Sequence, residues 1–163
     1  MRVLLCCLLA SVTTTTLALT SEDLRQMYGA SINVVPRRDG TPNSESFLLS
    51  PNIKLTVQYG SDRHACVMTL EPGAPQQPEE HGEQLMSSTR ISEILEQVAP
   101  ADKRGEKPRD GSSGISCAGS IGIWFENYAN VYIRHDIRCG EDPNSEKRVR
   151  VNFKREVCPK FEH

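Results

Sequence analysis

Apolar and polar residues alternate strictly in two parts of this chain, and this alternation constrains the fold more than any other feature. In 53–59 (IKLTVQY) every second residue is apolar, and HACVMTL at 64–70 follows a four-residue turn. VYIRHDIR at 131–138 and RVRVNFK at 148–154 show the same period. Because successive side chains of a strand point to opposite faces, this period predicts two antiparallel hairpins that each bury one face.

Two other segments have the apolar spacing of amphipathic helices. Thr20 or Ser21 can cap a first helix, which we expect to end near Gly29. Its apolar face would carry Leu24, Met27 and Tyr28. A second helix is predicted to start at Ser88 or Thr89 and to stop before Pro100. The apolar stripe of this helix comprises Ile91, Ile94, Leu95 and Val98.

The order helix, hairpin, helix, hairpin predicts an α+β fold. We expect a four-stranded antiparallel sheet built from the two hairpins, with both helices on one face. Residues 36–52 and 100–120 are rich in Pro, Gly or Ser and are predicted to be loops, whereas 121–125 (IGIWF) suits a short strand. The predicted core comprises Ile53, Leu55, Val57, Tyr59, Met68, Leu70, Ile91, Ile94, Leu95, Val98, Val131, Ile133, Ile137, Val149, Val151 and Phe153.

The N-terminus has the pattern of a secretory signal peptide. Arg2 precedes an apolar run at 3–10 that is too short to span a bilayer, and Thr16 and Ala18 fit a cleavage site. We expect residues 1–18 to be removed, residues 19–158 to form one disulfide-stabilised domain, and residues 159–163 to be a flexible tail. An uncleaved anchor is the alternative. The protein is therefore predicted to be secreted or periplasmic.

Four cysteines follow the predicted signal peptide, and in an exported chain they predict two disulfides. Their wide spacing is unlike that of a zinc site. If Arg138 lies opposite Arg148, Cys139 and Cys158 are about 30 Å apart at opposite ends of the hairpin, whereas a disulfide needs Cα atoms within about 7 Å. Two connectivities stay open, and the first is favoured: Cys66–Cys139 with Cys117–Cys158, or Cys66–Cys158 with Cys117–Cys139.

The polar face of the second hairpin is basic. Asp136 is its one acid, and its five cations are Arg134, Arg138, Arg148, Arg150 and Lys154. Because like charges on neighbouring strands are destabilising, we expect solvent, the acidic loop at 79–83 or an anionic partner to offset them. This surface is the candidate site for an acidic protein or an anionic envelope polymer, and a merely solvated face is the alternative. The overall net charge of −2 argues against a general nucleic-acid binder.

The chain has no recognised catalytic or cofactor motif. G-x-S-x-G, H-E-x-x-H, a phosphate loop and a dinucleotide fingerprint are all missing from the sequence. His64 and His135 are the residues that an unrecognised hydrolase would use, although His64 suits a turn and His135 a buried face. The EEHGE sequence at 79–83 suits a solvated loop better than a cation site. Four clustered aromatic residues could form a stacking platform or pack in the core: Trp124, Phe125, Tyr128 and Tyr132.

Several stretches together resemble a class of small uncharacterised secreted bacterial proteins. These are IKLTVQYGSDRHACVMTLEP, ISEILEQVAPADKRG, ENYANVYIRHDI and the terminal VNFKREVC, which span most of 53–158. The resemblance implies a layout and no active site. The helix and hairpin order also resembles secreted inhibitor modules made of helix-plus-sheet repeats. We therefore expect an exported non-enzymatic domain that binds a partner or envelope component, with an inhibitor of an extracellular enzyme or a hydrolase as alternatives.

Overall fold

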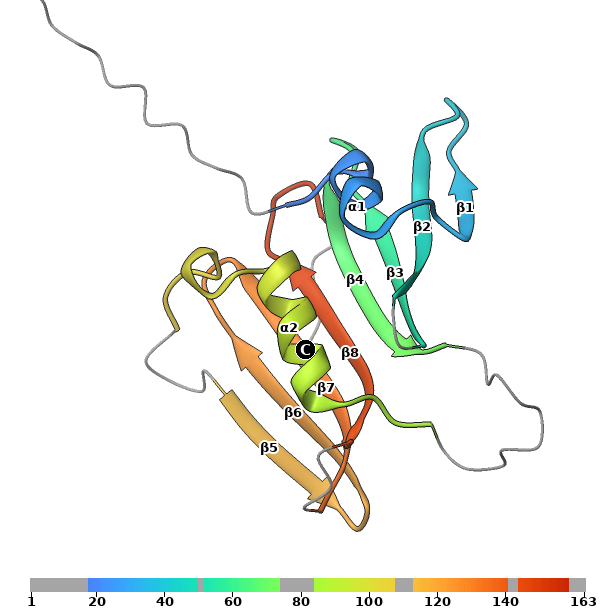
Figure 1. Cartoon of the computed structure of the whole chain (residues 1–163). Coiled ribbons are helices and arrows are strands. Elements are labelled where there is room, and N and C mark those ends of the chain that lie inside the picture. The colour runs from blue at the N-terminus through green and yellow to red at the C-terminus, as the bar shows by residue number, and fades with distance from the viewer. Residues whose placement is uncertain (1–17, 50–51, 74–83, 108–112, 141–143, 159–163) are drawn as a thin grey trace, which may run out of the picture.

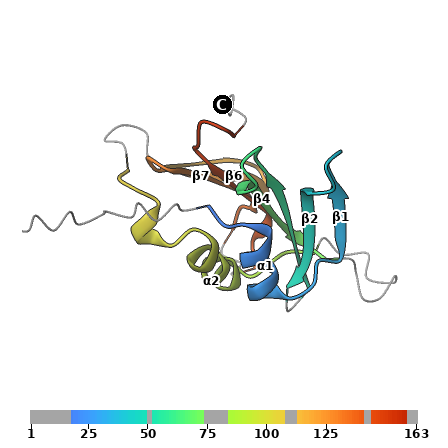
Figure 2. The same cartoon turned by 90° about the horizontal axis from the view of Figure 1, so that it is seen from above.

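The computed structural model describes residues 18–49, 52–73, 84–107, 113–140 and 144–158. Within these ranges, eight strands form one antiparallel sheet in the order β1-β2-β3-β4-β8-β7-β6-β5, and two α-helices lie on one side of it (Figure 1, Figure 2). The elements are α1 Ser21–Tyr28, β1 Asn33–Pro36, β2 Pro42–Leu49, β3 Ile53–Tyr59, β4 Ala65–Pro72, α2 Ser88–Val98, the 3-10 turn η1 Ala101–Lys103, β5 Ser113–Ala118, β6 Ile121–Asn127, β7 Val131–Arg138 and β8 Glu146–Phe153.

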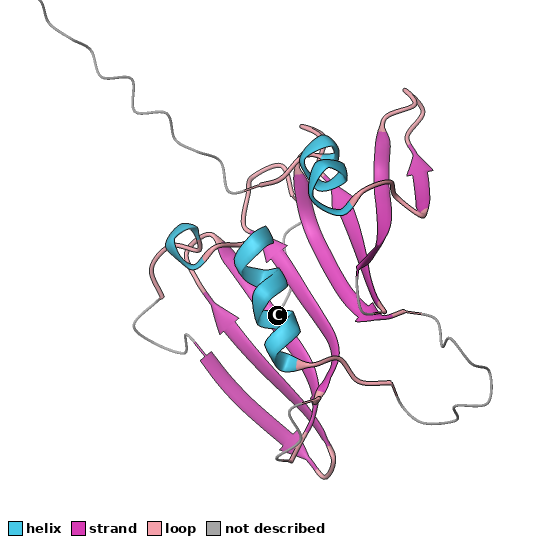
Figure 3. Cartoon of the chain, viewed as in Figure 1, coloured by secondary structure: helices cyan, strands magenta, loops and turns pink. Residues whose placement is uncertain are grey.

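The sheet consists of two similar halves. Each half is a helix followed by four strands that pair in sequence order, and the last strands of the two halves, β4 and β8, join them (Figure 3). At this junction Met68 lies opposite Val151 and Leu70 opposite Val149. Because β4 and β8 are antiparallel, a pseudo-two-fold axis passes between them and exchanges the halves.

The predicted α+β fold with a four-stranded sheet is wrong, since the protein is mostly β. The predicted strands correspond to β3, β4, β7 and β8, and IGIWF lies in β6. Strands β2 and β5 fall in segments that the sequence assigned to loops, and β1, apart from Pro36, falls in a stretch to which it assigned no element. In β2 the alternation is concealed because the buried residues include the carboxylate of Glu45. Strand β5 ends the sheet, and its one large apolar residue, Ile115, is 67% exposed.

The core between the sheet and the helices is the one predicted. All sixteen expected core residues are buried, and the apolar stripe of α2 packs against the sheet. Further residues outside the predicted core are buried as well: Leu24, Phe47, Leu49, Ala65 and Met86. No helix in the described ranges is both long and apolar enough to cross a membrane.

Helix α1 is held at its start and on its sheet side. Thr20 caps it as predicted, and hydrogen bonds from the side chain and backbone of Thr20 lower the pKa of Asp23. The side chain of Glu45 is fully buried beneath the helix, where Tyr59 Oη donates to it at 2.7 Å and Arg25 Nε at 3.0 Å. Burial raises the pKa of Glu45, but hydrogen bonds from Ser21, Tyr59 and Arg25 outweigh it and lower the pKa.

Candidate functional site

The four cysteines form two disulfides, Cys66–Cys158 and Cys117–Cys139, with Cα separations of 5.3 and 6.2 Å. The prediction that Cys139 does not pair with Cys158 is confirmed, but the favoured connectivity of Cys66 with Cys139 and Cys117 with Cys158 is wrong. The favoured pairing placed Cys117 before the third strand and Cys158 beside the start of that strand. In the structure Cys117 lies in β5 itself, which pairs with β6. Two disulfides are consistent with a secreted protein.

The Cys117–Cys139 disulfide crosses β6 at a glycine. Cys117 pairs with Gly122 of β6, and Gly122 pairs in turn with Ile137 of β7. A Cβ atom at Gly122 would lie 2.3 Å from the Sγ of Cys139, so only glycine leaves room for the bridge. The other disulfide ties the chain after β8 to β4, where Arg155 also forms an ion pair with Asp62.

The outer face of the sheet, defined here by the side chains opposite the helices, is the candidate binding surface. Neither α1 nor α2 covers it (Figure 2). Of the five predicted cations, the structure brings three together at its centre: Arg134 and Arg150 are cross-strand partners, and Arg148 is the partner of Asp136. The predicted register, with Arg138 opposite Arg148, is therefore wrong by two residues, since Asp136 is the partner of Arg148, and a bulge after Asp136 shifts the pairing further.

The other two predicted cations lie apart from this centre. Arg138 is exposed at the end of β7, opposite Ile121. Lys154 follows β8, where its ammonium donates to the Asn127 side chain and the Tyr128 carbonyl, both at 2.5 Å. Desolvation lowers the pKa of Lys154. The two hydrogen bonds of Lys154 connect the end of β8 to the end of β6.

Two acidic side chains partly neutralise the centre of the outer face. Arg148 Nε lies 2.9 Å from Glu71, and Arg134 Nε lies 2.8 Å from Asp136. Glu71 also lies 3.4 Å from Lys54 Nζ, so sequence analysis missed both Glu71 and Lys54 as members of this surface. Only the pairing of β4 with β8 places them there. The acidic loop at 79–83, the expected internal partner, lies outside the described residues.

The aromatic cluster is divided between the two faces of the sheet. On the outer face Phe125 stacks on Tyr132 with a ring separation of 6.1 Å, and Phe125 is the cross-strand partner of Arg134. Trp124 points to the helix side, where its ring stacks on that of His135 at 4.3 Å. A single platform of four rings is therefore not formed, but each face keeps an aromatic pair.

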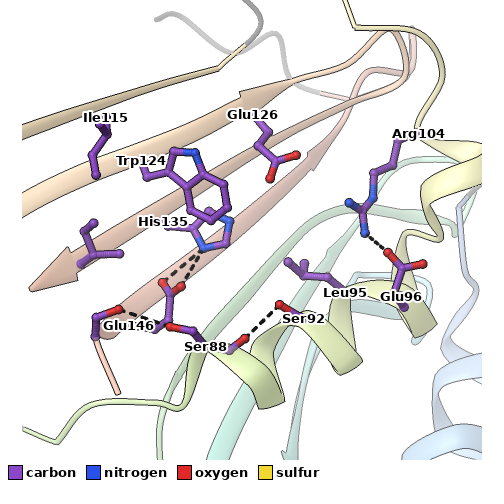
Figure 4. A pocket seen from close by; sticks show the side chains of 12 residues that line it. Ser88, Ser92, Leu95, Glu96, Arg104, Ile115, Trp124, Glu126, His135 and Glu146 are labelled. Atoms are coloured by element: carbon purple, nitrogen blue, oxygen red, sulfur yellow. Dashed lines mark hydrogen bonds and ion pairs between the residues drawn. The ribbon is translucent and has the colours of Figure 1, made fainter. Parts of the chain in front are cut away.

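A cavity of about 300 Å³ lies on the helix side of the sheet, between α2 and strands β6, β7 and β8 (Figure 4). His135 is 3% exposed there, and its Nδ1 lies 3.2 Å from both carboxylate oxygens of Glu146. Its Nε2 is buried and has no hydrogen-bond partner among the described residues. Trp124, Leu95 and Arg104 also line the cavity. His135 was predicted to be a buried histidine, but the sequence did not reveal its carboxylate partner.

The two histidines do not form a recognisable hydrolase site. His64 lies at the turn before β4, where its Nδ1 contacts the Asp62 carbonyl at 2.9 Å. At the cavity, the hydroxyls of Ser88 and Ser145 lie 3.2 Å apart and hydrogen-bond to each other. Since His135 Nε2 lacks a hydroxyl partner within the described part of the chain, His135 and Glu146 have no nucleophile in position.

Comparisons with known proteins do not assign a family. No family model and no curated protein matches the chain. The solved structure of a DUF4309 family protein (YjgB) from Bacillus subtilis subsp. subtilis str. 168 is similar, with 12% sequence identity and a TM-score of 0.40. The aligned region covers 83% of this chain and 78% of that protein. An extracellular protein containing a SCP domain from Bacillus anthracis str. Ames matches 84% of this chain over 44% of its own, with 10% identity and a TM-score of 0.34.

Proposed function

We propose that this chain is an exported, non-enzymatic binding domain, secreted or periplasmic, whose outer sheet face binds an acidic protein. The observation that carries this proposal is the placement of Arg134 directly opposite Arg150 at the centre of a face that no helix covers. Like charges in direct cross-strand positions destabilise a sheet, and an acidic partner would offset this repulsion by supplying negative charge.

The charge of this face contrasts with that of the whole chain. Four cations and two acids share its centre, namely Lys54, Arg134, Arg148, Arg150, Glu71 and Asp136. The complete chain carries a net charge of −2. A positive surface on an acidic protein directs the association of negatively charged partners and makes that association dependent on salt.

A protein suits this surface better than an anionic polymer does. Asp136 and Glu71 lie among the cations, where they would repel a polymer of uniform negative charge. A protein surface can match both signs of charge. The stacked Phe125 and Tyr132 lie next to Arg134, and aromatic residues with arginine are the side chains that most often dominate binding in protein interfaces.

The proposal is tested with the double variant Arg134→Gln/Arg150→Gln and two immobilised probes, poly-L-glutamate and heparin. The matched control is Arg38→Gln/Lys103→Gln, which changes the net charge equally at exposed sites of the β1–β2 turn and η1. We expect the wild type and the control to be retained on poly-L-glutamate at low salt, and the double variant to elute early. Retention should disappear at physiological ionic strength, where exposed charges are screened over about 8 Å.

The other outcomes have distinct meanings. Retention on heparin alone would indicate an anionic polymer as the partner and would contradict the proposal. Equal elution of all three proteins from both columns would show that the outer face is only solvated. Thermal unfolding of each variant separates loss of binding from loss of folding, which matters because Arg134 and Arg150 are only partly exposed.

A further inference from the structure

We propose that the cavity beside α2 is a second binding site, which takes a small neutral or cationic molecule with an aromatic or alicyclic body and one hydroxyl or amine. In this assignment, Trp124 contacts the body and His135 Nε2 accepts the hydrogen bond of the hydroxyl or amine. The site lies on the helix side of the sheet, so it is separate from the outer face and independent of the function proposed for that face.

The carboxylate of Glu146 determines what His135 offers to a ligand. Both oxygens of Glu146 lie 3.2 Å from His135 Nδ1, and a carboxylate can only accept hydrogen bonds. In the neutral imidazole the proton is therefore on Nδ1, and Nε2 has a free lone pair. Figure 4 shows His135 between Trp124 and Glu146, with its other ring nitrogen directed away from Glu146.

The missing hydrogen bond of the buried His135 Nε2 is the main reason to expect a ligand in this cavity. Nearly all buried polar atoms of folded proteins form hydrogen bonds, and an atom that forms none is a destabilising feature that needs an explanation. His135 is 3% exposed, and Nε2 has no partner among the described residues. A ligand with a donor group would supply the missing bond at a position where the protein itself supplies none.

Comparison of the two halves of the sheet shows that the fold does not require this polar cavity. Met68 and Val149 are matching positions of the two halves, and their cross-strand partners are Val57 in the first half and His135 in the second. Leu55 and Ile133 match in the same way, and their partners on the next strand are Phe47 and Glu126. The pseudo-two-fold axis thus exchanges Val57 with His135, and Phe47 with Glu126. Val57 and Phe47 are fully buried and fill the space beneath α1.

In the second half the same two positions are polar and border a cavity. In the first half, the ring centroid of Phe47 lies 6.4 Å from that of Tyr28 in α1. The matching position of the second half is Glu126, which lines the cavity. His135 replaces a valine, and its buried charge partner Glu146 occurs opposite the end of β7. The second half therefore departs from a well-packed apolar solution at the two positions that give the cavity its polar groups.

The other lining residues define the ligand class. Trp124 and Ile115 provide an apolar wall, and a cavity of about 300 Å³ is at the small end of the range for ligand sites. The one cation of the lining, Arg104, is already held by Glu96 at 2.6 Å and by the Ala99 carbonyl at 2.7 Å. Glu126 and Glu146 add negative charge. These groups favour a neutral or cationic ligand and disfavour an anion.

The test compares p-cresol, which carries a hydroxyl donor, with 4-methylanisole, which has the same ring but no donor. Trp124 is the only tryptophan of the chain, so its indole N–H signal in a proton–nitrogen correlation spectrum reports on the cavity wall alone. We expect both compounds to shift this signal and p-cresol to bind about tenfold more tightly, as one hydrogen bond to a buried acceptor allows. The anion 4-hydroxyphenylacetate should bind more weakly than p-cresol.

Two variants identify the acceptor. His135→Val introduces the residue of the matched position in the first half, and it should remove the preference for p-cresol while ring binding persists. Glu146→Gln keeps the shape of the side chain, but its amide can donate to Nδ1 as well as accept from it, so Nδ1 no longer has to carry the imidazole proton and Nε2 can become the protonated nitrogen. This variant should lower the preference for p-cresol or reverse it. The outer-face variant Arg134→Gln/Arg150→Gln serves as the control and should bind both compounds like the wild type.

Several results would overturn the assignment. These are an unchanged Trp124 signal with p-cresol up to millimolar concentration, equal affinity of the wild type for the two neutral compounds, or an undiminished preference for p-cresol in Glu146→Gln. If His135→Val does not fold, Glu146→Gln still decides the role of Nε2. Because the poly-L-glutamate experiment probes the opposite face, either proposal can fail without affecting the other.

Discussion

Gly122 lies beneath the Sγ of Cys139, so close that a Cβ atom at position 122 would come within 2.3 Å of the sulfur. The same Cβ would lie 3.0 Å from the Sγ of Cys117. The disulfide between these cysteines therefore depends on a missing side chain in the strand that it crosses. Neither sulfur can move away without breaking the bridge between β5 and the end of β7.

We expect Gly122→Ala to prevent formation of the Cys117–Cys139 disulfide or to destabilise the protein by about 2–4 kcal/mol, the typical contribution of a disulfide. Thiol alkylation followed by mass spectrometry would detect the two free cysteines, and chemical denaturation would give the stability. Gly119→Ala is the control for thiol alkylation alone, because nothing lies within 4 Å of a Cβ at that turn position, whereas its positive φ of 62° should cost stability. A fully oxidised Gly122→Ala protein with unchanged stability would contradict the expectation.

The two disulfides should differ in their contribution to stability. Cys66 and Cys158 are 92 residues apart in the chain, whereas Cys117 and Cys139 are 22 apart. In the chain-entropy description, the longer loop gives about 4–5 kcal/mol and the shorter about 3–4 kcal/mol. Cys66→Ser/Cys158→Ser should therefore lower the free energy of unfolding more than Cys117→Ser/Cys139→Ser does, as measured by urea denaturation. The reverse order would show that native-state contacts, rather than loop length, determine the effect.

Glu45 should make the protein sensitive to acid. Its pKa in the folded state lies below the unfolded value of about 4.3, so its stabilisation is fully present above that value and is lost as the pH falls through the folded pKa. We expect Glu45→Gln to destabilise the protein by about 1–3 kcal/mol at neutral pH and to flatten the loss of stability below about pH 4.5. Denaturation curves between neutral and acidic pH would measure both effects.

The control for this experiment is Glu22→Gln, because Glu22 is exposed in the first turn of the same helix. It removes the same charge without a buried hydrogen-bond network. Its unfolding free energy should stay within about 0.5 kcal/mol of the wild type. An equal pH dependence for Glu45→Gln and wild type would show that Glu45 is not the group whose protonation weakens α1.

The exported protein should begin at or near Leu19 and contain no free thiol among its four downstream cysteines. The Leu19 carbonyl accepts a hydrogen bond of 2.8 Å from the Ala65 N–H, so the structured domain already includes this residue. Intact-mass measurement of the exported protein, with and without reduction, gives both results. An intact Met1 or two alkylatable cysteines in the unreduced protein would contradict the expectation.

Local sequence determined the strands and helices that carry a clear apolar face. The alternation at 53–59, 64–70, 131–138 and 148–154 and the stripe of 88–98 identified every residue of the expected core, because burial of one face requires that pattern. The same rule failed for β2, where the core-facing carboxylate of Glu45 is stabilised by Tyr59 and Arg25 from other elements. It also failed for β5, an edge strand with little to bury.

Tertiary pairing alone decided which residues meet. The sequence identified the cations of the second hairpin and four cysteines that form disulfides, since charge and residue type are local properties. It could not place Glu71 beside Arg148, Glu146 beside His135 or Cys117 beside Cys139. Each of these contacts depends on the order and register of the strands in the sheet, and the position of Glu146 depends also on the one-residue bulge after Asp136. A shift of one residue moves a side chain to the opposite face.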